Sequence, residues 1–301
     1  MLAVKTYSND LNLVRREMRL MGNRFEISVV GSDTVWAHKC IDGAAAEINR
    51  VEKLLSTLSD DSKVTEINRN AGLKAVKVSA EVFRLIERAL EISELTHGAF
   101  DITYQADNEQ NELNQVKSTN YTHVVLNAEQ STVFLKKRGM RIGFGAISKG
   151  YAADRAKYIL QFMGVSSGVV NAGGDLLTWG LQPDHQPWTI GTADPHQENQ
   201  PYSDIRISNM AVATSGNFDK NAAINDKMAN IDTRKGFPVS ILKSVSVVSP
   251  TAELSDAMAT PVMSMGVNAG LYLINKLQQL ACFIIDDHDR IYTSKEINYL
   301  T

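Results

Sequence analysis

Apolar positions in the first third of the chain recur with two different periods. Residues 24–30 (RFEISVV) alternate apolar and polar side chains, which predicts a strand with one buried face. Residues 35–58 place apolar side chains every three or four positions, which predicts a long amphipathic helix. The same spacing over residues 79–96, opened by a serine that can cap the first turn, predicts a second helix. The polar, aperiodic segment 107–119 is expected to be an exposed loop.

Short apolar runs and three further helical patterns follow. We expect strands at 122–126, 132–135, 168–171, 188–192, 205–208, 211–214, 244–249 and 281–285, and helices at 151–163, 253–265 and 269–277. Helices and strands mingle without regular alternation, which favours an α+β fold over a doubly wound sheet. No linker divides the chain convincingly. We therefore predict one domain over residues 19–301, preceded by an N-terminal extension of residues 1–18.

Composition narrows the function classes. The 301 residues are 44% hydrophobic and 22% charged with a net charge of -3, ordinary values for a globular protein with a full core. Basic residues are scattered among acids, which argues against nucleic-acid binding. No apolar run approaches a membrane span, and the N-terminus lacks the apolar centre of a signal peptide. We expect a cytoplasmic protein, or a periplasmic one only if a leader was removed, with Cys40 and Cys282 as buried thiols.

The segment 141–154, RIGFGAISKGYAAD, is the most informative short stretch. Small residues leave the main chain open to a ligand, and Lys149 stands just before the helix expected from Tyr151. A helix N-terminus and a lysine together favour a phosphorylated ligand. The alternative is a tight connection between a strand and a helix, with a lysine on the surface.

Three other short motifs each allow a chemical and a structural interpretation. The glycine pair of NAGGD (171–175) permits close ligand approach or forms a plain turn. The hydroxyls of TSG (214–216) bind phosphate or the edge of a flavin ring, or cap a turn. Asp256 and Thr260 share one helix face as partial ligands for Mg²⁺, or else serve only the helix itself.

Nine segments, from about Arg19 to Ile285, occur in a familiar order. They are MGNRFEI from Met21, LSTLSDDSKVTEIN from Leu55, HGAFDIT from His97, GAISKGYAADRA from Gly145, NAGGDLLTWG from Asn171, WTIGTADP from Trp188, AVATSGNFDK from Ala211, DTRKGFPV from Asp232 and SDAMATPVMSMG from Ser255. In this order the chain resembles the ApbE family of Mg²⁺-dependent FAD:protein FMN transferases. The resemblance implies a single T-fold-related α+β domain with mixed or antiparallel sheets and packed helices.

The resemblance also implies a reaction and a site. FAD is split at its pyrophosphate, AMP leaves, and FMN is joined through a phosphoester to a Thr or Ser of an acceptor protein. Mg²⁺ would be held by Asp256, Thr260 and the carbonyl of Ala146, while Lys149 would reach the phosphates. The positions that match the family's cofactor site are Met21, Leu58, Ala99, Phe100, Asp101, Gly143, Lys149, Gly173, Gly174, Thr214, Ser215, Gly216 and Ile231.

Several positions depart from the family pattern. The family usually has HIIDPRTG where this chain reads ANIDTRKG, so Ala229 (or Asn230, with a one-residue gap) occupies the place of the proposed base. Leu58 replaces a tyrosine of the FAD site, and Gly143 replaces an aspartate. Three hypotheses follow: a transferase that uses another group such as Asp232 as its base, an FAD-binding protein or slow FAD pyrophosphatase, and a non-catalytic partner-binding paralogue. Retention of Lys149 and the metal pair argues against the third.

Overall fold

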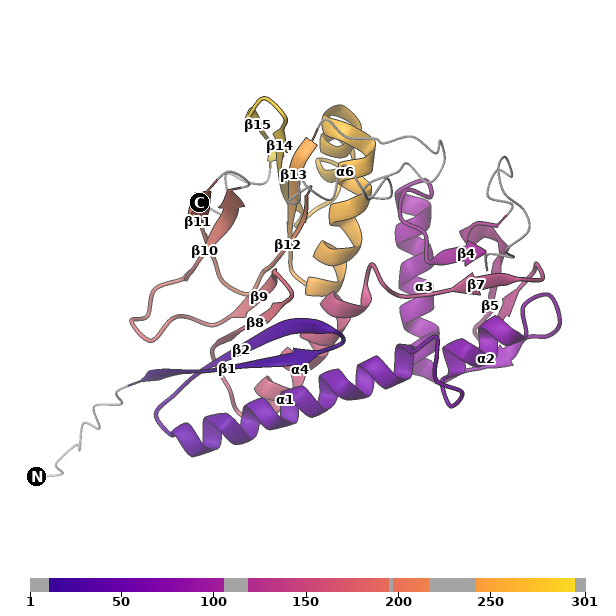
Figure 1. Cartoon of the computed structure of the whole chain (residues 1–301), viewed down its shortest axis with the longest axis horizontal. Coiled ribbons are helices and arrows are strands. Elements are labelled where there is room, and N and C mark those ends of the chain that lie inside the picture. Colours follow the sequence, from indigo (N-terminus) through magenta and orange to yellow (C-terminus); the bar gives the residue numbers. More distant parts are fainter. Residues whose placement is uncertain (1–10, 106–118, 195–196, 217–241, 296–301) are drawn as a thin grey trace, which may run out of the picture.

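Eight antiparallel strands form the largest sheet of the protein. The structure, a computed structural model, describes residues 11–105, 119–194, 197–216 and 242–295. The sheet has the order β1-β2-β8-β9-β12-β13-β14-β15 (Figure 1). Its strands are β1 (Asn12–Leu20), β2 (Asn23–Gly31), β8 (Gly168–Ala172), β9 (Asp175–Trp179), β12 (Ala211–Gly216), β13 (Leu242–Ser249), β14 (Ala281–Asp286) and β15 (Ile291–Thr293).

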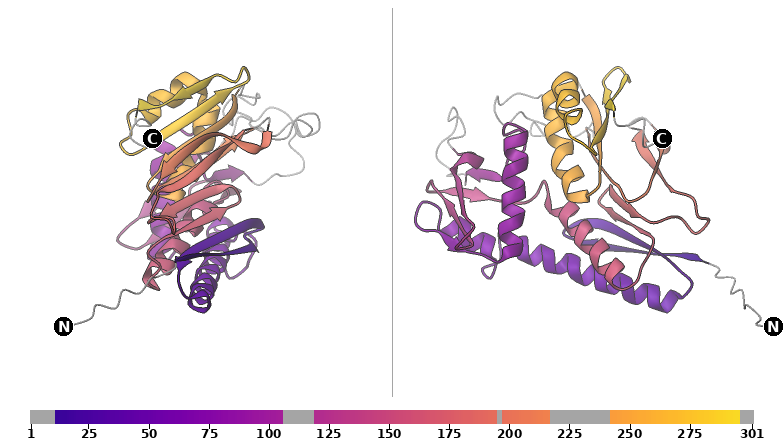
Figure 2. Two further views of the ribbon diagram at one scale, coloured as in Figure 1. Left: turned by 90° about the vertical axis from the view of Figure 1, so that its left-hand side faces the viewer. Right: turned by 180° about the vertical axis from the view of Figure 1, so that it is seen from behind.

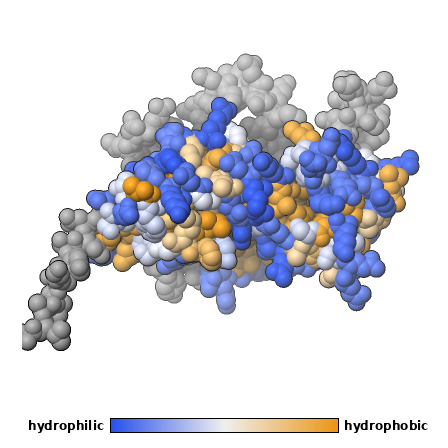
Figure 3. Space-filling model, turned by 90° about the horizontal axis from the view of Figure 1, so that it is seen from below, coloured by the Kyte–Doolittle hydropathy of each residue, from blue (hydrophilic) through white to orange (hydrophobic). Residues whose placement is uncertain are grey.

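Three helices pack against this sheet and against one another. They are α1 (Thr34–Leu55), α4 (Ser148–Phe162) and α6 (Ala252–Ile274). The first helix lies on β1, β2 and α4, and α4 in turn packs on α6, which covers β12 and β13 (Figure 2). The α1 helix is capped by Asp33, whose carboxylate accepts the backbone N–H groups of Val35 and Trp36. Its buried stripe faces the core, whereas the side seen in Figure 3 mixes hydrophilic and apolar residues.

A smaller region stands at the far end of α1 (Figure 1). It holds α2 (Lys63–Arg69), α3 (Ala80–Leu95), η1 (Tyr121–His123), a sheet of β3 (Val76–Lys77), β6 (Thr132–Leu135) and β5 (Val124–Asn127), and a pair of β4 (Thr103–Gln105) and β7 (Met140–Ile142). A hairpin of β10 (Trp188–Asp194) and β11 (Gln197–Ile207) completes the described elements. Most buried apolar side chains of the large sheet and of the smaller region form one continuous core, and a second, small cluster holds Ile207, Val212, Val248 and Ala281. The predicted α+β class is confirmed.

Four predicted boundaries need correction. The first helix ends at Leu55 rather than residue 58, because Ser56 leaves the helical conformation and its hydroxyl accepts the N–H groups of Leu58 and Ser59. The α4 helix begins at Ser148, which places Lys149 in its first turn. The motif TSG is the end of β12 rather than a turn after it. Residues 12–18 do not lie outside the domain, since β1 pairs with β2 along its whole length.

The two helices expected over 253–265 and 269–277 form one element, α6, with a break. Gly266 has φ 77° and ψ 177°, which interrupts the helix there. By length and composition, α6 is the one helix in the described ranges that is apolar enough to cross a membrane. Its contacts with β12 and β13 are those of a helix that covers the core of a sheet. The segment 107–119, predicted as a loop, falls almost entirely outside the described residues.

Candidate active site

A cavity of about 360 Å³ opens where α4 and α6 meet the ends of strands β8, β9 and β12. It is lined by Gly145, Ala146, Lys149, Gly173, Asp175, Ala213, Thr214, Ser215, Asp256, Ala259 and Thr260. The four short motifs that we singled out from the sequence therefore meet here: the small-residue stretch, the glycine pair, the hydroxyl pair, and the aspartate and threonine of α6. The long-range pairing of the sheet brings these segments together.

One lysine and two carboxylates form the charged centre of this cavity. The Nζ atom of Lys149 lies 3.2 Å from Oδ1 of Asp256 and 3.4 Å from Oδ2 of Asp175. All three side chains are largely removed from solvent. Burial opposes the charge of Lys149, but the two carboxylates outweigh it and raise the pKa of the ammonium group. The lysine therefore stays charged, and two carboxylates share it.

Asp175 is the less expected member of this cluster. Burial and the neighbouring Asp256 raise the pKa of Asp175 to about 6, although Lys149 and the backbone N–H of Thr214 act in the other direction. Sequence reasoning missed this residue as a site residue, because the NAGGD motif was read for its glycines. The signal in the sequence that could have indicated this residue is the position of the acid, which ends the motif directly after its two glycines.

Asp256 is held by the backbone of α4 as well as by Lys149. Its Oδ2 atom accepts the N–H of Gly150 at 3.0 Å. Gly150 follows Lys149 in the first turn of α4. The carboxylate of Asp256 therefore binds both the backbone of this turn and the ammonium group of Lys149. The first turn of α4 has no side-chain cap.

Hydroxyl groups line the side of the cavity formed by β12 and α6. The hydroxyls of Ser215 and Thr260 lie 2.7 Å apart, and those of Thr214 and Ser246 lie 2.8 Å apart. Thr260 stands one helical turn after Asp256, so both face the cavity, as their spacing predicted. Ser215 and Thr260 thus bring β12 and α6 into contact beside the carboxylates.

The glycine pair forms the turn between β8 and β9. Gly173 and Gly174 have φ values of 70° and 105°, a region that favours glycine. The carboxamide oxygen of Asn171 accepts the N–H of Gly174 at 2.8 Å. This tight turn places Asp175 at the edge of the cavity.

A second cavity, of about 330 Å³, adjoins the first and shares Gly145 with it. Three residues predicted for the cofactor site line it: Met21, Leu58 and Gly143. Leu58 is 91% exposed, since it follows the end of α1. The structure therefore divides the predicted contacts between a charged cavity and a neighbouring, less polar one.

Other predicted site residues lie apart from both cavities. Phe100 is buried in the core, and Asp101 accepts the backbone N–H groups of Thr103 and Tyr121. Neither residue lines a described cavity, nor does Ala99. Their contact with FAD stays a prediction. Gly216 ends β12 beyond the lining residues, and Ile231, Asp232 and Ala229 lie outside the described residues.

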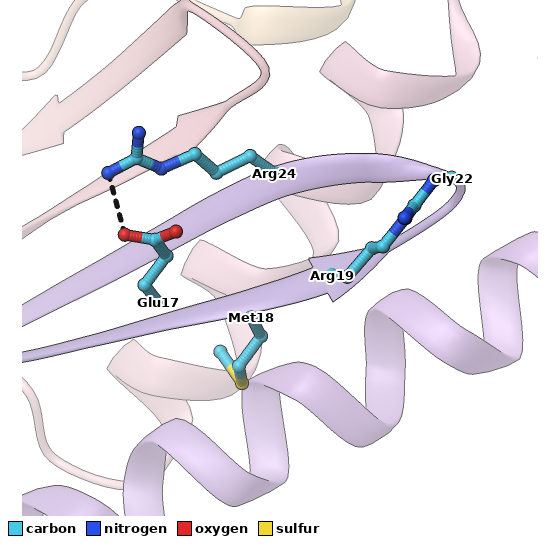
Figure 4. A pocket seen from close by; sticks show the side chains of 5 residues that line it. All are labelled: Glu17, Met18, Arg19, Gly22 and Arg24. Carbon is cyan, nitrogen blue, oxygen red and sulfur yellow. Dashed lines mark hydrogen bonds and ion pairs between the residues drawn. The ribbon is translucent and has the colours of Figure 1, made fainter.

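A third cavity, formed by residues of the β1–β2 hairpin, is separate from this site. It is lined by Glu17, Met18, Arg19, Gly22 and Arg24. Figure 4 shows Arg24 and Glu17 pointing toward one another, and their charged groups pair at 2.6 Å. Both side chains are mostly exposed, and none of the predicted site residues lines this cavity.

Comparisons with known proteins agree with this arrangement. A model of the ApbE family matches residues 21–284. A FAD:protein FMN transferase of Klebsiella pneumoniae (strain 342) is 28% identical over 296 residues, which cover 92% of this chain and 90% of that protein. The curated relative thus carries the transferase name that the sequence landmarks led us to expect.

Solved structures share the fold. The ApbE protein of Thermotoga maritima has a TM-score of 0.81 at 24% identity, covering 96% of this chain and 99% of that one. The flavin transferase ApbE of Vibrio cholerae also has a TM-score of 0.81, at 21% identity, covering 97% of this chain and 100% of that one. Because the family model spans most of the chain and the fold agrees over nearly all of it, this protein belongs to the ApbE family.

Proposed function

We propose that this protein is a Mg²⁺-dependent FAD:protein FMN transferase that attaches FMN to a Thr or Ser of an acceptor protein. The observation that carries the proposal is the meeting of Lys149, Asp175 and Asp256 with the hydroxyls of Ser215 and Thr260 in one cavity. The name of the curated relatives supports the same reaction.

The start of α4 suits a pyrophosphate group. Its first turn has no side-chain cap, and the small residues Gly145 and Ala146 line the cavity just before it. Backbone N–H groups at a helix N-terminus attract anions. Lys149 adds a full positive charge in the same turn, and its Nζ would donate to phosphate oxygens.

The donors in the cavity fit Mg²⁺. Two carboxylates share one ammonium group, so the charged centre keeps a net negative charge that attracts a cation. In the described part of the chain, no group of three or more His, Cys, Asp or Glu side chains could hold a metal. Mg²⁺ accepts such a small set, because it prefers oxygen ligands and takes others from phosphates and water.

Asp256, Thr260 and the Ala146 carbonyl would hold this ion. When bound, Mg²⁺ neutralises the charge that develops on the phosphate oxygens. Lys149 neutralises the same charge from the helix side, and the small lining residues let the phosphates approach the main chain.

The proposed transfer forms one bond and breaks one. The acceptor hydroxyl oxygen bonds to the phosphorus on the flavin side of FAD, and the bond from that phosphorus to the bridging oxygen breaks. AMP leaves with the bonding electron pair. The hydroxyl proton passes to a base, for which Asp232 is our candidate from the sequence.

The second candidate function is hydrolysis of FAD to FMN and AMP. It is favoured by Ala229, since alanine cannot accept the proton that the family's histidine would take. Water would then replace the acceptor hydroxyl. The third hypothesis, a non-catalytic partner-binding paralogue, is disfavoured because such a protein has no need of the charged cavity.

One experiment separates these functions. The purified protein is incubated with FAD, Mg²⁺ and an acceptor carrying a Thr-containing flavinylation motif, with the Thr→Ala acceptor as control. Transfer gives a fluorescent acceptor band together with AMP, and the control acceptor stays dark. AMP without a labelled acceptor indicates the pyrophosphatase, and a protein that binds no FAD contradicts both.

Substitution of the metal pair tests the site itself. Asp256→Ala should abolish any Mg²⁺-dependent release of AMP. Glu129→Ala, at an exposed acid between β5 and β6, is the matched control and should behave as the unchanged protein. Equal activity of both variants would show that the metal site is wrongly placed.

A further inference from the structure

The cavity beside the charged centre is built from five segments. Its lining comes from the β1–β2 turn, the end of α1, the turn after α1, strand β4, and the stretch that precedes and opens α4. The lining residues are Met21, Glu52, Leu55, Ser56, Thr57, Leu58, Tyr104, Gly143, Phe144, Gly145 and Ser148. Because Gly145 lines both cavities, a ligand held at Lys149 can extend into the second one.

Tyr104 is the tyrosine in this lining, and its ring lies against Gly143. A Cβ atom placed on Gly143 would stand 3.1 Å from Cε1 of Tyr104, closer than ordinary van der Waals contact. The N–H of Gly143 donates to the carbonyl of Ile102 at 2.9 Å, and Tyr104 pairs with Arg141 across β4 and β7. The backbone therefore holds Gly143 beside Tyr104, and a side chain at position 143 would require the ring to shift by a few tenths of an ångström.

Tyr104 is only partly covered by the protein. Tyr104 is 36% exposed, while the other aromatic residue of the cavity, Phe144, is buried. A partly exposed aromatic ring that lines a cavity can stack on a second planar ring.

Met21 supports the same use of the cavity. It has φ 51°, and its N–H donates to Oε2 of Glu52 at 3.3 Å. Met21 lines the cavity, where a thioether makes favourable contacts with aromatic rings. The cavity thus combines a partly exposed aromatic ring, a polarisable thioether and the carboxylate of Glu52.

We propose that Tyr104 is the stacking residue for a planar heterocycle of the bound dinucleotide, and that Gly143 is required to hold Tyr104 in place. The inference rests on the proposed function, since FAD is the ligand that would join a pyrophosphate at Lys149 to such a ring. Both ends of FAD carry a planar nitrogen heterocycle. The shared chemistry is stacking, and the test distinguishes adenine from isoalloxazine.

The test is equilibrium binding of FAD, ADP and FMN to the full chain and its variants. Loss of one stacked base costs about 1–3 kcal/mol, so Tyr104→Ala should weaken FAD binding about tenfold. Tyr104→Phe should bind as the unchanged protein. Tyr104→Leu, which keeps apolar bulk without a ring, should lose affinity as Tyr104→Ala does.

Gly143→Ala tests the second part of the proposal. It adds one methyl group next to the Tyr104 ring and should weaken FAD binding in the same direction. Thermal melting of each variant confirms that it folds. Tyr272→Ala, at an exposed tyrosine of α6, is the matched control and should leave binding unchanged.

The arms have distinct meanings. If Tyr104→Ala weakens ADP binding and spares FMN, the ring is adenine; the reverse identifies isoalloxazine. If the unchanged protein binds FAD, and Tyr104→Ala binds FAD, ADP and FMN as tightly as the unchanged protein does, the inference is wrong while the proposed function stands. If the unchanged protein binds no FAD, the proposed function itself fails.

Discussion

Gly150 of α4 lies directly against the carbonyl of Ala252 at the start of α6. A Cβ atom on Gly150 would stand 2.2 Å from that oxygen, so only glycine fits. The close approach allows the Gly150 N–H to reach the Asp256 carboxylate at 3.0 Å. The contact between these two helices therefore sets the position of the proposed metal ligand.

Gly150→Ala should separate the two helices. We expect a loss of about 1–3 kcal/mol in the free energy of unfolding, because the added methyl group overpacks a rigid contact. We also expect weaker Mg²⁺ dependence of AMP release, since Asp256 would shift. Urea unfolding and Mg²⁺ titration measure the two effects.

A matched change at Gly145 serves as the control for this prediction. A Cβ atom there meets nothing within 4 Å. Gly145→Ala should therefore keep the stability of the unchanged protein. If Gly150→Ala is equally stable and keeps its Mg²⁺ dependence, the helix contact does not position Asp256.

The sequence predicted elements whose signals are local. The helix starting at Ser79 was predicted from its cap, and the structure confirms that the Ser79 hydroxyl accepts the N–H of Val82. The start of α4 was placed three residues too late, because Ile147 at its N-terminus gives no capping signal. Local patterning thus finds a helix and its face but misses an end that tertiary contacts determine.

The site was predicted unevenly for the same reason. Asp256, Thr260 and Lys149 stood out through their family motifs and do meet in one cavity. Asp175 and Tyr104 did not, because their importance depends on which distant segment lies beside them. Tyr104 lies beside Gly143 because β4 pairs with β7, and no pattern in the sequence predicts that pairing.

Asp175→Asn should weaken the attraction of the cavity for Mg²⁺. The change removes one of the two carboxylates beside Lys149 and leaves the charged centre neutral. We expect the Mg²⁺ concentration for half-maximal AMP release to rise about tenfold, the scale of a nearby charge partly screened by solvent. Mn²⁺ binding followed by electron paramagnetic resonance gives a readout independent of activity.

Glu129→Gln removes an exposed acid that lines no described cavity, and it should change neither the Mg²⁺ concentration for half-maximal AMP release nor the binding of Mn²⁺. An Asp175→Asn protein with the Mg²⁺ dependence of the unchanged protein would show that this carboxylate contributes nothing to the cation.

Ala229→His should restore a base if alanine stands where the family has its histidine. General bases contribute about 10²–10⁴ in rate, so we expect flavin transfer to rise at least about a hundredfold. Asn230→His is the matched variant, because a one-residue gap would move the position there. Acceptor fluorescence with time measures both rates.

If neither variant transfers flavin faster than the unchanged protein, the chain has not lost its base at position 229 or 230. Asp232→Asn should then lower the rate of transfer, since Asp232 is the alternative base. Residues 229–232 lie outside the described part of the chain, so these expectations rest on the sequence alone.

Asp154 makes the stability of the protein depend on pH. Its carboxylate accepts the N–H groups of Ala252 and Glu253 at 3.0 and 2.9 Å, which ties α4 to the start of α6. Burial raises the pKa of Asp154 to about 6; these two hydrogen bonds and Lys157 oppose the shift, and Glu253 adds to it. In the unfolded chain an aspartate titrates near pH ~4. The folded protein therefore binds the proton more tightly between these values.

The sign of the effect follows from this difference in proton binding. The free energy of unfolding should fall as pH rises from about 4 to about 6 and level off above that, because the folded state holds more protons in this window. Asp154→Asn removes the titrating group, so its unfolding free energy should fall less over the window. Asp175, whose pKa is also raised to about 6, contributes the same trend, and the double variant with Asp175→Asn should be flatter still. Urea unfolding of the three proteins at several pH values measures the slopes, and equal slopes for all three would show that neither carboxylate titrates as the buried geometry requires.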